Sequence, residues 1–573
     1  MDESLKKAFV AGVERLSAWA DLLDAINVFP VADGDTGRNL SISLTPLLAA
    51  GQEKGTVISR LLLSARGNSG NISSRFFSAL YAADFLHDLP RCAGEGRDRA
   101  WRAVENPRPG TILSFFDALT ECLSAGPTVM DRQAVDAIID HLEQSVRATC
   151  ELLPKLKEAG VVDAGALGMY IFFEGFFCSL AGTAHRYRPV TELFRGLLHP
   201  SSPLREDTET GYCVDFVVEA QNISARELTV ITGGEKNVVV IPHGNLYKIH
   251  LHTEDREKIR KAAEKAGSMV TWEDDNLVQQ IIEFKESGFN ESLHIMTDAA
   301  GSLTRADAKK NGITLLHSYI TVGGKCLPET HFHAGELYDA MRQGIKVSTA
   351  QASVYERRQF YESALARFGR VLYLCVGSVY TGNYSTASEW KKQHDYRNRF
   401  AIIDTGAASG RLAVIALAAA RFLAKSEDME QTIAFAARAV NSCEEYVFLE
   451  KLEYLAAGGR LSKTSAFFGD MLKMKPVVSP QPEGAKKVAV VRNQGEQIKM
   501  AREKLASSLN RQTKALIMLE YSDNYDLVEG KIKPLIAAEY PQAEIIIQPL
   551  SLTSGAHMGP GTWAVAFLPE EVT

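Results

Sequence analysis

The first 198 residues carry apolar side chains at helical intervals. Near the start, the apolar residues spaced three or four positions apart are Leu5, Phe9, Val13, Leu16, Ala20 and Leu23. Positions with this spacing lie on one face of a helix. No alternating, strand-like run occurs before residue 211. We therefore predict an all-α domain over residues 1–198.

The pattern changes after a charged, proline-bearing stretch, HPSSPLREDTETG at 199–211, which is typical of a linker. The segments YCVDFVVEA, NVVVIP and LYKIHLHT then alternate and are rich in β-branched residues, as strands are. The segments REKIRKAAEKAG and NLVQQIIEF have helical patterns and lie among or after these strands. Together they predict a small α/β domain over 211–287.

From residue 290 to 573, apolar strands alternate with helices. LHIMTDAAG (293–301), VLYLCVGSVYTG (371–382) and FAIIDTGAASG (400–410) each run from a strand into a Gly- or Ser-rich turn. Such alternation predicts an α/β fold with a largely parallel sheet. Ligands of these sheets bind outside the carboxyl ends of the strands, where the turns lie.

Composition indicates a globular protein of several domains. The 573 residues exceed what one hydrophobic core organises. The net charge of −7 argues against a nucleic-acid surface. The opening residues lack an apolar signal core, and the most apolar stretches are too short to span a bilayer. The eight cysteines are scattered singly. We expect a cytoplasmic protein that is not integral to a membrane and binds no nucleic acid.

Two acidic residues, Asp33 and Asp35, flank Gly34 in the stretch NVFPVADGDTGRN. Both carboxylates can turn toward one hard cation, and Mg²⁺ takes carboxylate oxygens together with phosphate oxygens. The alternative is a polar turn between helices, because D-G and T-G are common turn dipeptides.

A second glycine-rich stretch, ARGNSGN at 65–71, precedes a helical pattern. Glycines there let backbone N–H groups approach a phosphate at a helix N-terminus. The alternative is a plain capping turn. The chain has no G-x-x-x-x-G-K-[ST] motif, which excludes a P-loop kinase.

A third group of residues lies in the middle domain. His250 and His252 are two positions apart on a predicted strand and share a face, and Cys213 begins another strand. One cysteine and two histidines form a sound zinc set with one open position. The alternative is a surface histidine pair.

Four ordered motifs resemble the nucleotide-binding domain of bacterial fatty acid kinases, a relative of the helical-barrel domain of dihydroxyacetone kinases. They are NVFPVADGDTGRN, ARGNSGNISS, PRPGTIL (107–113) and AGVVDAGALGMYIFFEGF (159–176). The pattern GYC followed by K-x-H-x-H-T is similar to the middle domain of the same kinases. The resemblance implies a DhaL-like, ATP-binding helical-barrel domain over 1–198 and a kinase middle domain over 211–287.

This resemblance also implies roles for particular residues. Asp33 and Asp35 would hold magnesium on the ATP phosphates, and Asn27 would help where dihydroxyacetone kinases have a third acid. The residues that would line the nucleotide pocket are Asn39, Ser69, Gly70, Thr111 and Asp163. The middle-domain histidines and cysteine would form a metal or catalytic cluster, with zinc as a candidate. Departures from the family pattern are Ala32, Arg38 and Ala166. Arg38 could neutralise phosphate charge or point to solvent.

The third domain resembles the DegV family of fatty-acid-binding proteins. The motifs are MTDAAGS, KVSTAQAS (346–353), CVGSVYTGNYSTA (375–387), IIDTGAASG, EYLAAGGRLSK (453–463), MKPVVS and SGAHMGPG (554–561). The resemblance implies a two-lobed α/β domain over 290–573 that buries a long-chain fatty acid. Val379 and Tyr380 replace smaller family residues, which leaves the preferred acyl chain open.

The same resemblance implies a site for the lipid head group. Thr349 and His557, both expected in turns, and Ser378 after a strand would hydrogen-bond the carboxylate. Arg460 and Arg492 would stabilise an acyl phosphate or dock the kinase domain, with His557 and Arg460 taking part in catalysis. Taken singly, such a serine is more often a helix cap and a GGR turn a helix end.

Together these features predict that the protein phosphorylates a fatty acid with ATP and yields an acyl phosphate. We expect the protein to form a homo-oligomer. A membrane acyltransferase is a candidate recipient of the acyl phosphate. Two alternatives stay open. One is a kinase of a small polyol such as dihydroxyacetone, which leaves the DegV-like half without a role. The other is a lipid carrier or sensor whose nucleotide domain only regulates binding.

Overall fold

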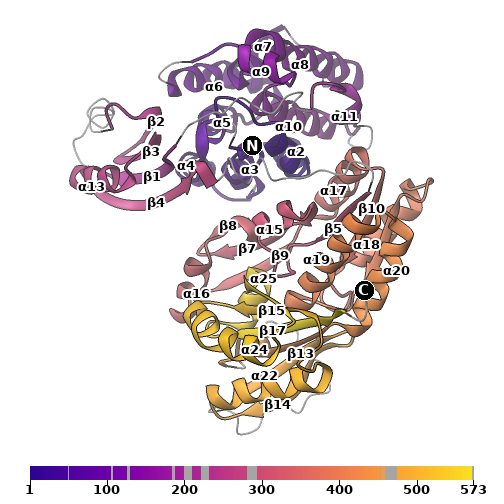
Figure 1. Cartoon of the computed structure of the whole chain (residues 1–573). Coiled ribbons are helices and arrows are strands. Elements are labelled where there is room, and N and C mark those ends of the chain that lie inside the picture. Colours follow the sequence, from indigo (N-terminus) through magenta and orange to yellow (C-terminus); the bar gives the residue numbers. More distant parts are fainter. Residues whose placement is uncertain are drawn as a thin grey trace. The chain divides into compact units, whose positions relative to one another are not determined.

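The chain divides into two compact units in a computed structural model, Met1–Glu286 and Ser287–Thr573 (Figure 1). The structure describes residues 1–31, 33–49, 51–104, 107–125, 130–183, 187–198, 210–220, 232–279, 293–451, 453–457 and 474–570. The predicted linker lies outside these residues from 199 to 209, as does the predicted helix NLVQQIIEF from residue 280 onward. No helix in the described part is long and apolar enough to cross a membrane.

The first unit begins with helices, which confirms the all-α prediction for this region. They are α1 (Glu3–Ser17), α2 (Ala20–Ala25), α3 (Thr36–Leu44), η1 (Thr45–Leu48), α4 (Lys54–Leu63), α5 (Gly67–Leu80), η2 (Leu86–Asp88), α6 (Leu89–Ala103), α7 (Ile112–Ala125), α8 (Arg132–Leu152), α9 (Pro154–Ala159), α10 (Ala164–Leu180) and α11 (Val190–Leu193).

Helix α10 is the centre of this helical part. Every residue from Ala164 to Cys178 is buried, as expected for a helix that is apolar on all sides. Its one acidic residue, Glu174, faces α1 and pairs with Arg15, whose Nε lies 3.0 Å from Glu174 Oε2. Both side chains are 2% exposed. A buried charge is tolerated only when it is paired, so α1 and α10 depend on each other electrostatically as well as through packing.

The first unit ends in a four-stranded antiparallel sheet of order β2-β3-β1-β4. Its elements are β1 (Tyr212–Glu219), β2 (Lys236–His243), β3 (Leu246–Thr253), α13 (Arg256–Ala266) and β4 (Ser268–Asn276). One face packs its apolar residues, including Phe216 and Ile249, against Ile259 and Ala263 of α13. The opposite face is also buried, because Val239 and Ile241 pack on Leu62 and Ala103 of the helical part.

The second unit contains three sheets. A parallel sheet has the order β11-β10-β5-β6, a mixed sheet has the order β14-β13-β12-β17-β15-β16, and an antiparallel sheet has the order β8-β7-β9. The strands are β5 (Leu293–Asp298), β6 (Ile313–Leu316), β7 (Ser318–Val322), β8 (Lys325–Pro328), β9 (Val347–Gln351), β10 (Arg370–Cys375), β11 (Phe400–Asp404), β12 (Glu444–Phe448), β13 (Lys475–Gln481), β14 (Gly484–Val491), β15 (Ala515–Tyr521), β16 (Glu544–Pro549) and β17 (Trp563–Pro569).

Helices accompany these sheets along the second unit. They are α15 (Arg305–Lys310), η3 (Glu329–His331), α16 (Ala334–Arg342), α17 (Val354–Arg367), α18 (Asn383–His394), α19 (Ser409–Ser426), α20 (Met429–Ser442), α21 (Glu453–Ala457), α22 (Gln494–Ser508), α23 (Tyr525–Leu527), η4 (Val528–Ile532), α24 (Lys533–Glu539) and α25 (Leu552–Met558). Residues of α19 and α20 share one core with both larger sheets, whereas α22, η4 and α24 cover a separate core on the six-stranded sheet. The α/β prediction is confirmed.

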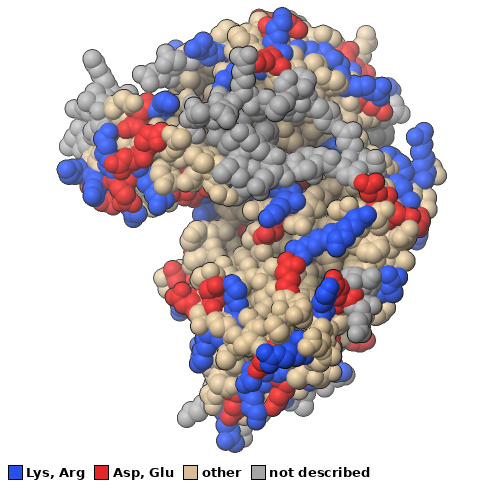
Figure 2. Space-filling view, in the orientation of Figure 1, with Lys and Arg blue, Asp and Glu red and all other residues tan. Residues whose placement is uncertain are grey.

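The surface of the second unit mixes both signs of charge. On the face drawn in Figure 2, lysines and arginines lie interspersed with aspartates and glutamates among uncharged residues. Such mixing is typical of the solvated surface of a globular protein, whereas a nucleic-acid-binding face gathers its basic residues in one patch or stripe.

The prediction of a largely parallel sheet is wrong for the six-stranded sheet. Only β15 and β16 run parallel there, and every other neighbouring pair is antiparallel. For one of these pairs the reason is local, because β13 and β14 are joined by a two-residue hairpin that ends at Gly484, whose φ is 113°. Such a short connection permits only antiparallel pairing.

A buried acid in the second unit makes its stability depend on pH. Glu329 is 4% exposed and accepts hydrogen bonds from Thr553, at 2.8 Å from N and 3.0 Å from Oγ1. Burial raises the pKa of Glu329 from 4.5 to about 7. Ionisation therefore favours the unfolded chain, and the stabilisation present below about pH 4.5 is lost as pH rises to about 7.

We predict that Glu329→Gln removes this part of the pH dependence. The difference in unfolding free energy between variant and wild type should change by about 3 kcal/mol between pH 4.5 and 8. Urea unfolding of the full chain across that range measures it, with Glu430→Gln on the surface of α20 as the control. A constant difference between Glu329→Gln and wild type would contradict the prediction.

Candidate functional site

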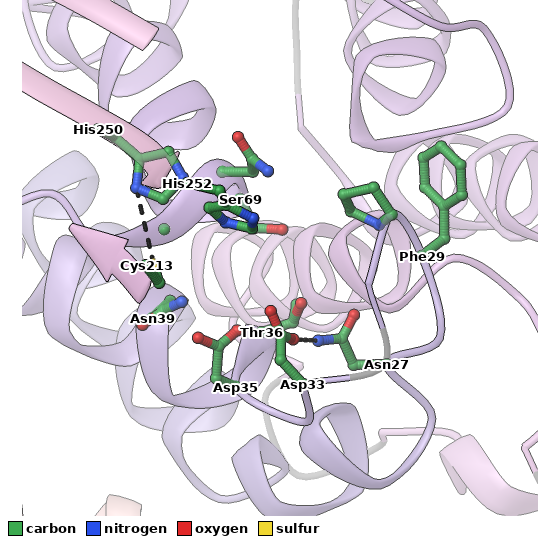
Figure 3. Close-up of a pocket in the computed structure, with 13 residues that line it drawn as sticks. Asn27, Phe29, Asp33, Asp35, Thr36, Asn39, Ser69, Cys213, His250 and His252 are labelled. Carbon is green, nitrogen blue, oxygen red and sulfur yellow. Dashed lines mark hydrogen bonds between the residues drawn. The ribbon is translucent and has the colours of Figure 1, made fainter. Parts of the chain in front are cut away.

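A pocket in the first unit brings the two glycine-rich stretches and the middle-domain sheet together (Figure 3). Its lining residues are Asn27, Phe29, Pro30, Asp33, Asp35, Thr36, Asn39, Gly67, Asn68, Ser69, Cys213, His250 and His252. Figure 3 shows the two acids with Asn27 on one side and the cysteine with its histidines on another. All six residues predicted for magnesium and zinc therefore line one cavity.

The two acids stand close together at the start of α3. Gly34 between them has φ 63°, a left-handed conformation that favours glycine, and Asp35 is the N-cap of α3. Burial and the charge of Asp35 raise the pKa of Asp33 well above its usual value, and burial also raises that of Asp35. A divalent cation held by both carboxylates would cancel this repulsion. The donor set therefore fits Mg²⁺.

The neighbours of these acids hold them in place. Asn27 Nδ2 donates to Asp33 Oδ1 at 2.6 Å, and the Asn39 side chain hydrogen-bonds Asp35. Arg38 was expected either to neutralise phosphate charge or to point to solvent. Its Nη1 in fact lies 3.6 Å from Asp275 Oδ2 on β4. Asn27 thus orients the Asp33 carboxylate through its amide.

Four helix N-termini lie around the pocket or next to it, those of α3, α5, α7 and α10. A side chain at Gly165 in α10 would meet Asp163 Oδ1 at 3.2 Å, Ile112 Cβ at 3.3 Å and Ser69 Oγ at 3.3 Å, so three of these ends converge there. Thr111 stands just before α7 and caps it, with Leu113 N donating to its Oγ1 at 3.3 Å. Converging helix N-termini favour anions such as phosphates.

Asp163 and Gly70 have structural functions in this arrangement. Asp163 caps α10 by accepting from Ala166 N at 2.7 Å, and burial raises its pKa to about 6. Gly70 lets α5 approach α3, since a β-carbon there would collide with Ser43 and the backbone of Asn39.

The cysteine and the histidines form a cluster on one face of the sheet. One ligand atom each of Cys213, His250 and His252 lies within 4.8 Å of the others. The three side chains are 7%, 0% and 6% exposed, in that order. Cys213 on β1 lies directly opposite His252 on β3. His250 Nε2 is buried without a hydrogen-bond partner among the described residues. Cys213 Sγ lies 4.0 Å from His250 Nδ1 (Figure 3). A thiol and two buried imidazoles, one of them with an unpartnered nitrogen, fit a bound zinc ion.

Sequence reasoning missed several charged residues that connect the cluster and the loops. Asp215 and Lys248 share the face of Cys213 and His250 because each lies two positions away on its strand. Burial opposes the charge of Asp215, but Lys248 and His250 hold its pKa below the ordinary value. Arg66 forms an ion pair with Glu273 of β4. The period-two spacing on the strands was the signal that could have found Asp215 and Lys248.

The second unit places the predicted head-group residues differently from expectation. Thr349 lies on strand β9 and His557 in helix α25, so the prediction that both lie in turns is wrong. Thr349 Oγ1 is nevertheless 3.1 Å from His557 Nε2. The residues are brought together because β9 and α25 pack against each other.

Two other predicted residues of this unit, Ser378 and Arg492, do not join that pair. Ser378 is exposed after β10, donates its backbone N–H to Asp404 Oδ1 at 3.0 Å and bonds neither Thr349 nor His557 within the described segments. Arg492 is exposed before α22, where its N–H donates to Glu496 at 2.7 Å. Arg460 lies outside the described residues.

Three family models match successive parts of the chain. A DAK2 domain matches residues 30–178, the middle domain of FakA-like fatty acid kinases matches 209–284, and the DegV family matches 292–570. The chain is therefore a multidomain protein with kinase-type domains. More particularly, the chain carries a DAK2 domain, a FakA-like fatty acid kinase middle domain and a DegV-family domain in one polypeptide.

Individual relatives cover only part of this arrangement. Protein YloV of Bacillus subtilis is 32% identical over 305 residues, 47% of this chain and 54% of the relative. An uncharacterized protein of Staphylococcus haemolyticus is 30% identical over 298 residues, with the same coverage of 47% and 54%. The chain thus spans about half the length of the curated relatives it matches.

Solved structures similar to about half of the chain include members of the DegV family. One is a fatty-acid-binding DegV family protein from Thermus thermophilus, with TM-score 0.45, 21% identity and coverage of 48% of this chain and 99% of that one. Another is DegV of Bacillus subtilis, described as a fatty acid binding protein, with TM-score 0.45, 18% identity and coverage of 49% and 100%.

Proposed function

We propose that this protein transfers the γ-phosphoryl group of ATP to the carboxylate of a long-chain fatty acid held by its DegV-family domain. The observation that carries the proposal is the joint presence, in one polypeptide, of a kinase-type domain with a paired-acid pocket and a DegV-family domain. The middle domain, of the FakA-like fatty acid kinase type, favours a fatty acid over a polyol as the acceptor.

The chemistry asks little of the protein beyond positioning. A fatty acid carboxylate is ionised at neutral pH, so no general base is needed. One carboxylate oxygen attacks the γ-phosphorus and the bond to the bridging oxygen breaks, which yields acyl phosphate and ADP without net proton transfer. Catalysis then consists of aligning two anions and neutralising the charge on the transferred group.

We assign the donor side of this reaction to the pocket of the first unit. Asp33 and Asp35, oriented by Asn27 and Asn39, would hold magnesium, which supplies positive charge on the phosphate oxygens when bound. The N-terminus of α5 with Ser69, and Thr111 and Asp163 at α7 and α10, would hold the nucleotide.

We assign the acceptor side to Thr349 and His557, which are already within hydrogen-bond distance of each other. Both would bind the carboxylate, with Ser378 as a further donor. His557, Arg460 and Arg492 would offset phosphate charge. The cytoplasmic location, a homo-oligomeric state and transfer of the acyl phosphate to a membrane acyltransferase belong to the same proposal.

The test is ATP consumption with oleate compared with dihydroxyacetone. Acyl phosphate formation with oleate alone is the expected result. Consumption with dihydroxyacetone alone would establish the polyol kinase instead. Nucleotide-dependent oleate binding without ATP consumption would establish the lipid sensor.

We predict that Thr349→Val weakens oleate binding by about 10- to 100-fold, because a hydrogen bond to a charged group contributes about 1.5–3 kcal/mol. Binding of oleyl alcohol should be much weaker in the wild type and nearly unaffected by the substitution, since the alcohol carries no charge. Calorimetry with both lipids measures this. Ser348→Ala, on the opposite face of β9, is the matched control. Equal oleate affinities of wild type and Thr349→Val would remove Thr349 from the head-group site.

A further inference from the structure

Asp215 on β1 has contacts on two sides that the phosphoryl transfer does not use. On the helical side, Gly67 N donates to its Oδ2 at 3.0 Å and Asn71 Nδ2 to its Oδ1 at 3.3 Å. On the sheet side, Lys248 Nζ lies 3.0 Å from Oδ1 and His250 Nδ1 lies 3.2 Å from Oδ2. The residue is 7% exposed. One buried carboxylate therefore joins two parts of the pocket.

The contacts on the helical side determine the shape of the loop before α5. Gly67, the first residue of α5, has φ 57° and gives its N–H to Asp215. Asn71 also donates to Gly67 O at 2.8 Å, so Asp215, Gly67 and Asn71 form a closed set. The Asp215 carboxylate thus accepts a hydrogen bond at this helix N-terminus, where a bound anion would otherwise be favoured. Asn68 and Ser69, which follow, line the pocket.

The contact on the sheet side orients one member of the cysteine–histidine cluster. Asp215 bonds His250 through Nδ1, which also lies 4.0 Å from Cys213 Sγ, and the buried Nε2 of this ring is the nitrogen without a partner among the described residues. A carboxylate bonded to the second nitrogen of a metal-binding histidine sets its tautomer and its orientation. A shift of His250 on metal binding would therefore move the carboxylate that holds Gly67.

We propose that Asp215 is a positioning residue that couples the cluster of Cys213, His250 and His252 to the nucleotide loop at the start of α5. Metal in the cluster and nucleotide in the pocket then strengthen each other's binding, since coupling between two sites is reciprocal. This inference rests on the proposed nucleotide site, and it adds a regulatory function for the middle domain.

The experiment measures ADP binding to the full chain by calorimetry, in excess magnesium, after removal of metal by a chelator. Zinc is either absent or present at a concentration that saturates each variant, as checked by equilibrium dialysis. In the wild type, zinc should raise ADP affinity by at least about fivefold. In Asp215→Asn, both ligands should still bind, zinc about 10- to 100-fold more weakly, and the effect of zinc on ADP should vanish.

Further variants keep the result interpretable. Asp215→Asn leaves the buried ammonium of Lys248 unpaired, so Asp215→Asn with Lys248→Met removes the charge pair as a whole. Coupling should be lost in this double variant too. Asp274→Asn is the control, because this acid of β4 bonds Trp272 and Arg256 instead. Coupling should survive there.

The outcomes separate this inference from the proposed function. A wild type that binds ADP without any effect of zinc, or that binds no zinc, would overturn the coupling and leave the kinase proposal standing. Coupling that persists in the double variant would overturn the assignment to Asp215. A wild type that binds no ADP would instead overturn the nucleotide site itself.

Discussion

Asp35→Asn should lower acyl phosphate formation by about a thousandfold or more, because charge neutralisation by a metal ion contributes several kcal/mol to the transition state. Asp33→Asn should have a similar effect. In the structure, burial and the neighbouring charge of Asp35 raise the pKa of Asp33, and a divalent cation bound between the carboxylates would offset their repulsion. An amide keeps the shape of the side chain and removes the charge that binds the ion.

The measurement is steady-state turnover with oleate over a range of magnesium concentrations. Oleate binding should be unchanged, since the substitution lies in the first unit. Asp21→Asn on α2 carries the same chemical change outside the pocket and should keep full activity. Near-normal turnover of either pocket variant at ordinary magnesium would show that the metal is held elsewhere.

The largest effect on stability is expected at the ion pair between α1 and α10. Arg15→Met should lower the unfolding free energy of the first unit by about 3–5 kcal/mol, because it leaves Glu174 charged and buried without its partner. The substitution also removes the guanidinium that lies 3.8 Å from the centre of the Tyr187 ring. Denaturant unfolding of the full chain measures this loss.

The double variant Arg15→Met with Glu174→Leu distinguishes charge from packing. Replacing both charges by apolar groups should restore most of the stability, since no unpaired charge is left. Arg132→Met, which breaks the solvent-exposed pair with Asp136, should have little effect. If the double variant were as unstable as Arg15→Met, the shape of Arg15 and not its charge would explain the loss.

The periodicity of the sequence predicted the helical part and the first three strands of the middle domain. It missed β4, because the run Glu273-Asp274-Asp275 has the composition of a charged loop. Glu273 and Asp275 belong in a strand because they face Arg66 and Arg38 of the helical part. Such a reason is tertiary, and no local pattern contains it.

In the second unit, too, contacts between distant segments determine strands that the local sequence did not predict. Thr349 stands in a polar segment next to the exposed Gly344, which has the composition of a turn, yet this segment pairs with β7 as a strand. The antiparallel order of the six-stranded sheet depends on β17, the last strand of the described chain, which inserts between β12 and β15. Pairings between strands so distant in sequence leave no trace in either strand's own alternation.

The middle-domain sheet is buried on both faces, one by its own helix and the other by the helical part. An excised copy of residues 211–286 would therefore present Val239, Ile241 and the charged face around Asp215 to water. The DAK2 and middle segments match separate family models, but they share one interior and should melt in a single cooperative transition. The point at which this polypeptide tolerates being divided or recombined thus lies near residue 287, after the middle segment and not before it.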